Sequence, residues 1–306
     1  MRHNKYVKVR VPASTSNLGS GFDSIGMGLD LYNEFEITVE KKGIKVEVVG
    51  EGEDKLPKNK QNLVCVAMDL AFKRLKFKPK GLRIRTINHI PMERGLGSSA
   101  AAIIGGILAA NALAGNQLSE REILDLAFEL EKHPDNLVSA LLGGITLATV
   151  EDGHIVYMGL PVPLELKVVL VIPDFTLSTH KARSVLPKKI NFSDAVFNLG
   201  RASMLTASLI AGRYDLMRIA VQDKLHQPYR FMISPKMKKI FDIASDSGGC
   251  ATALSGAGSS ILTFVNHHVH PNEVAQNVMR ELINKKITCQ VKVLDIVKRG
   301  ALVEAH

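Results

Sequence analysis

The sequence has 306 residues, of which 46% are hydrophobic and 23% are charged, as in an ordinary globular protein. This length can form two packed lobes with substantial cores, which argues against wholesale disorder. The formal net charge is +9, but the lysines and arginines are scattered instead of clustered on one arm or stripe, so no nucleic-acid partner is expected.

Targeting and redox signals are weak. Cys65, Cys250 and Cys289 lie far apart and form no CxxC pair, which predicts no zinc site and favours reduced thiols in a cytoplasmic protein. Residues 1–11 are charged and do not resemble a signal peptide. The apolar stretch at 100–114 is interrupted by glycines and is too short to span a bilayer, so no membrane partner is expected.

The first third of the chain reads as strands. Apolar and polar residues alternate over 35–39 and over 44–48, and the turn Lys41-Lys42-Gly43 stands between them. This pattern predicts a hairpin. The same period of two continues over 82–86, which predicts a further strand.

Two helices are predicted next. Residues 98–115 are apolar on all sides, which indicates a buried helix. A second helix starts after Ser119, because Ser119 is a good N-cap and Glu122 completes a capping box. Pro134 is expected to end it.

A continuous apolar run over 166–172, bounded by Pro173, predicts a strand buried on both faces. Helical patterns follow near 194–212, 236–245 and 271–284, with strands at 261–265 and 290–297. Strands and helices are mixed but do not alternate regularly. The predicted fold class is therefore α+β with two lobes, an N-terminal lobe over 1–160 and a C-terminal lobe over 161–306.

The strongest chemical signal is Gly95-Leu96-Gly97-Ser98-Ser99, placed directly before the buried helix. Glycines let the backbone approach a phosphate closely, and a helix N-terminus offers unpaired N–H groups with partial positive charge. The two serines add hydroxyl groups. The sequence is not a Walker A motif, since no Gly-Lys-Ser/Thr ends it, and a plain serine-capped turn is the alternative.

Two further stretches are rich in small and polar residues. They are residues 12–23, which contain Asn17 and Asp23, and residues 254–260, which contain Gly256. Loops of this kind often line ligand pockets. Taken singly, the first is also compatible with an ordinary surface turn, and the second is better explained as a flexible loop.

Together and in this order, the three stretches resemble the motifs of the GHMP kinases, a family that includes galactokinase, homoserine kinase and mevalonate kinase. The resemblance extends from Val9 to about Val265. It implies an N-terminal lobe like domain 2 of ribosomal protein S5, a ferredoxin-like C-terminal lobe, and a site between them. It also implies that ATP binds in the loop at 91–102, at Asn62, Pro91, Arg94, Gly95, Leu96, Gly97, Ser98, Ser99 and Ala100.

Four local features resemble the homoserine kinase branch: the Asn17 to Asp23 loop, His133-Pro134-Asp135-Asn136, the pair Thr179 and Arg183, and Gln227-Pro228-Tyr229-Arg230. This resemblance implies L-homoserine as the substrate and O-phospho-L-homoserine, of threonine biosynthesis, as the product. Arginine is suited to the substrate carboxylate, and Asp23 to its ammonium. The implied substrate-binding positions are Asn17, Asp23, His133, Asn136, Thr179, Arg183, Arg230 and Gly256.

A kinase of this family is expected to use Mg²⁺, which takes oxygen ligands and usually retains waters. Ser98 and Ser99 are candidate ligands, together with a carboxylate from the segment after Ser119. The family pattern implies Glu129, with Glu131 as the alternative. Helical spacing is also compatible with a solvated face that carries Glu129.

Asn136, Asp23 and Arg183 are the residues to which the resemblance gives catalytic roles. Several relatives have an aspartate base where this chain has Asn136, so no strong base is implied, and Asp23 and Asp135 remain candidates. The chain departs from the usual pattern at Lys132, Ser139 and Ser259.

Two alternatives to the homoserine kinase resemblance remain. A mevalonate-type kinase would leave Asn17 and Asp23 unexplained, and a non-catalytic relative would not be expected to keep the phosphate loop intact. Family members of this type are often dimers, but no residue of the sequence indicates a homodimer.

Overall fold

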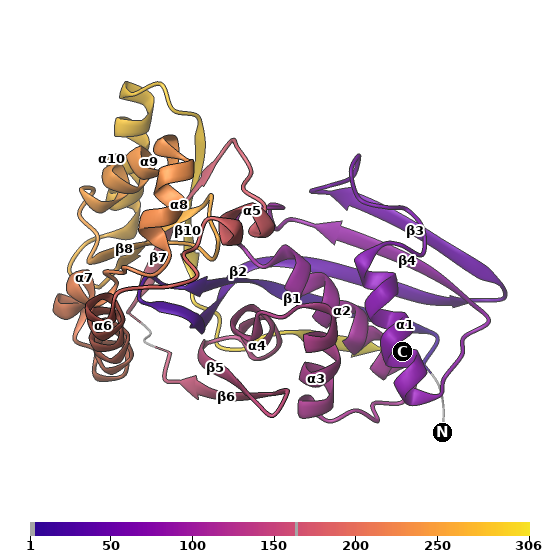
Figure 1. The fold of residues 1–306 in the computed structure, drawn as a ribbon. Coiled ribbons are helices and arrows are strands. Elements are labelled where there is room, and N and C mark those ends of the chain that lie inside the picture. Colours follow the sequence, from indigo (N-terminus) through magenta and orange to yellow (C-terminus); the bar gives the residue numbers. More distant parts are fainter. Residues whose placement is uncertain (1–3, 163–164) are drawn as a thin grey trace.

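The computed structural model describes residues 4–162 and 165–306. They form two lobes, each built from a sheet with helices packed against it (Figure 1). Strands and helices do not alternate along the chain in a regular way, and the sheets are largely antiparallel. The predicted α+β class is confirmed.

Seven strands of the described residues form the first sheet, in the order β11-β1-β2-β4-β3, with β5 paired to β2 and β6 to β5. The helices of this lobe lie on one side of the sheet in Figure 1. The strands are β1 (Tyr6–Asn17), β2 (Gly21–Glu40), β3 (Gly43–Gly50), β4 (Gly81–Asn88), β5 (Ile145–Glu151), β6 (His154–Leu160) and β11 (Leu302–Ala305). The helices are α1 (Leu63–Leu75), α2 (Ser98–Leu113), α3 (Glu120–Leu130) and α4 (Pro134–Leu142).

The predicted hairpin between residues 35–39 and 44–48 is wrong. β4 lies between β2 and β3, antiparallel to the first and parallel to the second, so α1 connects two neighbouring parallel strands. Leu82 and Ile84 of β4 are buried, whereas Ile44 of β3 is 39% exposed. β4 takes the inner position and β3 forms the edge, although β3 has the more apolar sequence of the two.

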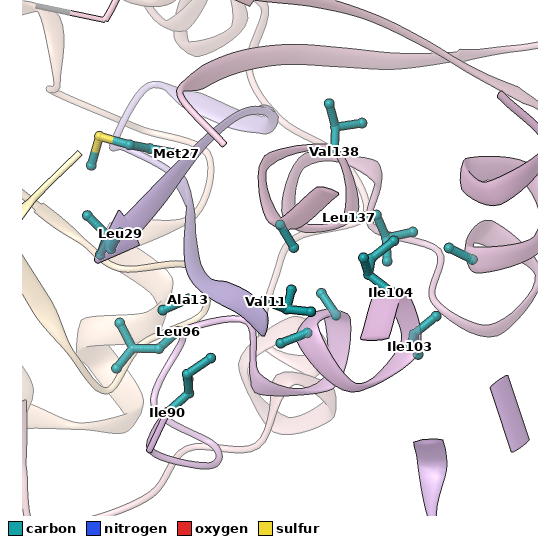
Figure 2. Close-up of a cluster of buried hydrophobic side chains, with 14 of the residues drawn as sticks. Val11, Ala13, Met27, Leu29, Ile90, Leu96, Ile103, Ile104, Leu137 and Val138 are labelled. Carbon is teal, nitrogen blue, oxygen red and sulfur yellow. The ribbon is translucent and has the colours of Figure 1, made fainter. Parts of the chain in front are cut away.

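Helix α2 occupies the centre of the first lobe, and most of its side chains are buried. Gly105 lets it approach Phe35, because a Cβ there would lie 2.3 Å from the ring, and Gly106 lets it approach α1. Figure 2 shows Ile104 of α2 meeting Leu137 of α4, with Val11 of β1 nearby in the same apolar cluster. The all-round apolar pattern therefore indicated a buried helix correctly.

The capping box at the start of α3 is formed as predicted, with Ser119 and Glu122 bonded reciprocally. Pro134 follows the end of this helix and also begins the next one. The chain is extended at Glu131 and His133, and Pro134 is the first residue of α4. Proline is well suited to the first turn, where its missing N–H is not needed.

The second lobe contains a four-stranded antiparallel sheet in the order β10-β7-β9-β8. With α9 and α10 this gives a βαββαβ succession, the ferredoxin-like arrangement that was expected. The strands are β7 (Lys167–Pro173), β8 (Ala251–Leu254), β9 (Ile261–Val265) and β10 (Cys289–Asp295). The helices are α5 (Thr179–Ser184), α6 (Phe192–Ala211), η1 (Tyr214–Leu216), α7 (Met217–Ala220), α8 (Gln227–Ile233), α9 (Pro235–Ser245) and α10 (Pro271–Asn284).

The end of the chain returns to the first lobe. β11 pairs antiparallel with β1, from Leu302 opposite Arg10 to Ala305 opposite Val7. The last strand within the C-terminal lobe predicted over 161–306 therefore belongs to the first sheet. The division after residue 160 falls between β6 and β7, which belong to different sheets.

None of the helices in the described ranges is long and apolar enough to cross a membrane.

Candidate active site

A cavity of about 340 Å³ lies between the lobes. All three motif stretches contribute to its wall, together with α1, α5, α8 and the segment before α4. Its lining residues are Ser16, Asn17, Asp23, Asn33, Phe35, Leu56, Asn62, Leu63, Val64, Thr86, Asn88, Pro91, Met92, Glu93, Gly95, Leu96, Gly97, Ser98, Ser99, Ala102, Glu131, His133, Asp135, Asn136, Thr179, Arg183, Arg230, Gly256 and Ala257.

The phosphate loop has a shape that requires glycine at two positions. Gly95 and Gly97 both have positive φ, 72° and 67°. A Cβ on Gly95 would lie 1.9 Å from the carbonyl oxygen of Ser255, and one on Gly97 would lie 1.9 Å from Oγ of Ser14. The loop is thus in direct contact with the first and third motif stretches, and a side chain at either glycine would separate them.

The loop ends where α2 begins. Gly97 is the N-cap of α2 and supplies no side-chain hydrogen bond, and the first turn contains no acidic residue. The first N–H groups of the helix, together with the hydroxyl groups of Ser98 and Ser99 at the cavity wall, are therefore donors with no acidic side chain in the same turn. A helix N-terminus of this kind favours the binding of an anion.

Part of the cavity wall is apolar. Phe35 of β2, Leu56, and Leu63 and Val64 at the start of α1 line it, together with Thr86 of β4. Sequence reasoning missed these positions, because Phe35 and Thr86 follow the ordinary alternation of strand residues and carry no motif.

Asn62 lines the cavity and also caps α1. Its side-chain oxygen accepts a hydrogen bond from the N–H of Val64 at 3.1 Å, and its amide donates to the carbonyl oxygen of Pro57 at 2.9 Å. Its side chain therefore shapes the apolar part of the cavity through α1.

Two of the predicted ATP positions do not line the cavity. Ala100 is 1% exposed and belongs to the core of the first lobe. Arg94 turns to a second cavity behind the loop, where its Nη2 donates to the carbonyl oxygen of Asp174 at 3.0 Å. The pattern of the loop gave their sequence positions but not the direction of their side chains.

The predicted substrate residues do lie together. Asn17, Asp23, His133, Asn136, Thr179, Arg183, Arg230 and Gly256 all line the cavity. Asp23 and Arg183 form a bidentate ion pair across the lobes, with Nη2–Oδ1 at 2.6 Å and Nη1–Oδ2 at 3.1 Å. Asn17 fixes the backbone of Asp23, whose N–H donates to the Asn17 side-chain oxygen at 2.9 Å.

Arg230 is 1% exposed although it is charged. Its Nη1 donates to the carbonyl oxygen of Gly256 at 3.0 Å and to Nδ1 of His226 at 2.8 Å. Burial, with the nearby charge of Arg183, lowers the pKa of Arg230 to about 10. Arg230 is therefore still a cation at neutral pH and increases the positive charge at this end of the cavity.

The side chain of Asn136 is held on three sides. Its amide donates to Oγ of Ser16 at 2.9 Å and to the carboxylate of Asp135 at 3.2 Å, and its oxygen accepts from Oγ of Ser14 at 3.1 Å. Asp135 is buried beneath it. Burial, followed by the charge of Asp23, raises the pKa of Asp135 to about 6.

The structure distinguishes the two candidate glutamates. Glu131 lines the cavity and contacts Nδ1 of His133, whereas Glu129, two residues earlier and still in α3, is not part of the wall. Ser98, Ser99 and Glu131 all line the cavity, and their hydroxyl and carboxylate oxygens are ligand types that fit Mg²⁺.

Comparison with known proteins agrees with this geometry. Profiles of the GHMP kinases match residues 62–144 (N terminal domain) and 205–285 (C terminal). The chain belongs to the GHMP kinase family, whose members are small-molecule kinases.

Within the family, the chain is 43% identical over 298 residues to homoserine kinase of Caldicellulosiruptor saccharolyticus, covering 97% of this chain and 96% of that protein. The crystal structure of homoserine kinase from Cytophaga hutchinsonii has a TM-score of 0.90 at 28% identity and covers 99% of both chains. The predicted resemblance to the homoserine kinase branch is confirmed.

Mevalonate kinase of Methanococcus jannaschii shares the fold, with a TM-score of 0.69 at 17% identity over 97% of this chain and 99% of that one.

Proposed function

We propose that this protein transfers the γ-phosphoryl group of ATP to the hydroxyl of L-homoserine, giving ADP and O-phospho-L-homoserine for threonine biosynthesis. One observation carries the proposal. A single cavity joins a helix N-terminus that can bind phosphate to a carboxylate and two guanidinium groups that match the charges of an amino acid. The homoserine kinase relatives support the same substrate.

The nucleotide would lie along the first lobe. Its phosphates would be bound by the N–H groups and hydroxyls at the start of α2. Its base would fill the apolar part beside Phe35, Leu63 and Val64. Of the predicted ATP positions, Pro91, Gly95, Leu96, Gly97, Ser98, Ser99 and Asn62 border this space, and Arg94 would act only through the back of the loop.

Ser98, Ser99 and Glu131 would hold Mg²⁺, and Glu131 replaces Glu129 in this proposal because it reaches the cavity. When bound, the metal would offset the negative charge of the phosphates during transfer. The exact ligand set stays a prediction.

The amino-acid substrate would enter between Asp23 and the arginines. Asp23 would bind its ammonium, and Arg183 and Arg230 its carboxylate, since paired charge-assisted hydrogen bonds suit guanidinium and carboxylate groups. Asn17 already makes hydrogen bonds through both its oxygen and its amide, so it shapes the position of Asp23 and Gly256. His133 and Thr179 border the same space.

None of the three candidates Asn136, Asp135 and Asp23 is placed as a free strong base near this position. Asn136 cannot accept a proton at neutral pH, Asp135 is buried and bonded to Asn136, and Asp23 is paired with Arg183. We propose that the protein acts by positioning and electrostatic stabilisation, with the hydroxyl proton leaving late to phosphate or solvent. Asn136 would orient the reacting groups through its fixed amide.

A coupled ADP-release assay tests the proposal with L-homoserine, L-serine, L-threonine, mevalonate and galactose as acceptors. Turnover is expected to be selective for L-homoserine and to require Mg²⁺. Turnover with mevalonate instead would retain the family and the phosphate loop but would overturn the roles given to Asp23, Arg183 and Arg230. A cytoplasmic location and a homodimer stay predictions.

A further inference from the structure

His226 is buried behind the proposed substrate site. It is 0% exposed and does not line the cavity, yet it touches Arg230, which does. Its Nε2 lies 2.8 Å from the carbonyl oxygen of Gly19, and its Nδ1 lies 2.8 Å from Nη1 of Arg230. A carbonyl oxygen only accepts and a guanidinium only donates. The ring must therefore be neutral, with its hydrogen on Nε2 and a lone pair on Nδ1.

The ring is fixed from several directions. The carboxylate of the buried Asp223 accepts hydrogen bonds from the N–H groups of His226 and Gln227, at 3.0 and 2.7 Å. The ring stacks on Phe22 with centroids 4.9 Å apart and an interplanar angle of 17°. A histidine with this many constraints can hold a partner side chain in a single orientation.

The donors of Arg230 are divided between protein and cavity. Nη1 bonds to His226 and Gly256, and Nε donates to the carbonyl oxygen of Ala182 at 3.4 Å. Among the described residues no hydrogen-bond partner is found for Nη2, which leaves its two hydrogens for a ligand. The arginine is thus anchored along one edge, and the other nitrogen is free.

We infer that His226 is a positioning residue for the proposed reaction, which aligns Arg230 so that its Nη2 meets the carboxylate of the amino-acid substrate. His226 contacts neither substrate nor nucleotide in this role. Burial lowers the pKa of His226 to about 4, which agrees with a ring that stays neutral under working conditions. The inference rests on the proposed function, because it assigns Arg230 to the substrate carboxylate.

Two amide substitutions separate the two hydrogen bonds of the ring. In His226→Asn the amide oxygen can take the place of Nδ1 and accept from Arg230, while the bond to Gly19 is lost. In His226→Gln the amide nitrogen can take the place of Nε2 and donate to Gly19, while the acceptor for Arg230 is lost. Both variants replace the buried ring with an amide side chain. If the role of His226 were purely structural, the two variants should lose similar amounts of activity and stability.

The expected result is a split in the kinetics. His226→Gln should raise the KM for L-homoserine about 10-fold or more and leave the KM for ATP within about threefold, as expected for about 1.4 kcal/mol or more of lost binding. His226→Asn should lose much less. Combining His226→Gln with Arg230→Ala should add little to the effect of Arg230→Ala alone, because coupled residues are not additive.

The inference would be overturned if both variants changed the KM for L-homoserine equally and in parallel with their melting temperatures. Full additivity of the effects of His226→Gln and Arg230→Ala would also overturn it. A readout independent of activity is the ¹⁵N–¹H NMR spectrum of the His226 ring. It should show the Nε2–H tautomer with no titration between pH 5.5 and 8, and an Nδ1–H form or a titration in that range would contradict the inference. If the unmodified protein does not phosphorylate L-homoserine, the proposed function fails; if it does and His226→Gln behaves like the unmodified protein, only this inference fails.

Discussion

The carboxylate of Asp23 accepts two hydrogen bonds from the guanidinium of Arg183, at 2.6 and 3.1 Å, inside the cavity proposed to receive L-homoserine. Asp23 belongs to β2 of the first lobe and Arg183 to α5 of the second lobe. Each partner carries the charge that one end of an amino acid needs. Substrate binding would therefore exchange one ion pair for two, so neither charge loses its partner when the amino acid enters.

Asp23→Asn is expected to weaken the binding of L-homoserine, because it removes the charge that faces the ammonium. A charge-assisted hydrogen bond contributes about 1.5–3 kcal/mol, so the KM for L-homoserine should rise about 10- to 100-fold while the KM for ATP changes little. The measurement is steady-state kinetics with L-homoserine and with 4-hydroxybutyrate, which lacks the ammonium. Discrimination between these two acceptors should shrink in the variant. If turnover collapses while the KM for L-homoserine is unchanged, Asp23 acts in the chemical step instead.

Gly97→Ala is expected to disable the phosphate loop. The new Cβ would meet Oγ of Ser14 at 1.9 Å, and Ser14 donates to Asn136, so the strain would reach both halves of the cavity. We expect kcat/KM for ATP to fall at least about 100-fold, equivalent to about 2.7 kcal/mol of transition-state stabilisation.

The matched control is Gly153→Ala in the turn between β5 and β6. Gly153 also has positive φ, at 80°, but no atom lies within 4 Å of the position of its Cβ. It should lose about 1–2 kcal/mol of stability from the left-handed backbone and keep its kinetics. Equal kinetic losses in the two variants would show that backbone strain alone, and not contact with Ser14, explains Gly97.

Glu131→Gln is expected to raise the Mg²⁺ concentration needed for half-maximal activity, by about 10-fold or more, because it removes a carboxylate from the cavity wall. Glu129→Gln, two residues earlier in α3, is the control and should titrate like the unmodified protein. The measurement is an Mg²⁺ titration of turnover at fixed ATP, with removal of the metal by EDTA as the zero point. If Glu129→Gln raised the Mg²⁺ requirement and Glu131→Gln did not, Glu129 would be the metal ligand.

The contrast between these two glutamates shows where sequence reasoning ends. The capping box at Ser119 places the start of α3 correctly, but the end of the helix depends on the three residues that precede Pro134 and are not helical. Glu131 turns toward the cavity because it leaves the helical path, whereas Glu129 keeps it. No local spacing rule predicts that change.

Short-range patterns predicted the elements with their own chemistry: the capped α3, the buried α2, and the glycine turns of the loop. Long-range pairing was not predictable in the same way. β4 lies between β2 and β3, where the hairpin was expected to pair them. The burial of Leu82 and Ile84 depends on which neighbouring strands are available. The sequence does not show which way the side chains of Arg94 and His226 point. Only the packing of both lobes shows that Arg94 points away from the cavity and that His226 supports Arg230.

Asp135→Asn is expected to change how stability depends on pH. Asp135 has its pKa raised from 3.8 to about 6, so its protonated form favours the folded state below pH 4, and this contribution is lost as the pH rises through 6. The shift corresponds to about 3 kcal/mol. The variant lacks this term, so its unfolding free energy relative to the unmodified protein should increase by about that amount between pH 4 and pH 7.

The measurement for Asp135→Asn is urea unfolding of both proteins across this range. His226 acts in the opposite direction, since its lowered pKa makes stability fall as the pH drops from 6.5 towards 4. Because both proteins contain His226, its contribution cancels in the difference. A difference that is independent of pH would show that Asp135 is not held in its neutral form by burial.

The pairing of β11 with β1 has a consequence for folding during synthesis. β1 is synthesised long before its partner on the outer side, which spans Leu302 to Ala305. At about 5–20 residues per second, that edge would wait roughly 15–60 s for its partner. During this interval the backbone groups of β1 are open to pairing with other chains. The first sheet thus begins to be made before the second lobe and is completed after it, and its open edge is where a chaperone would bind.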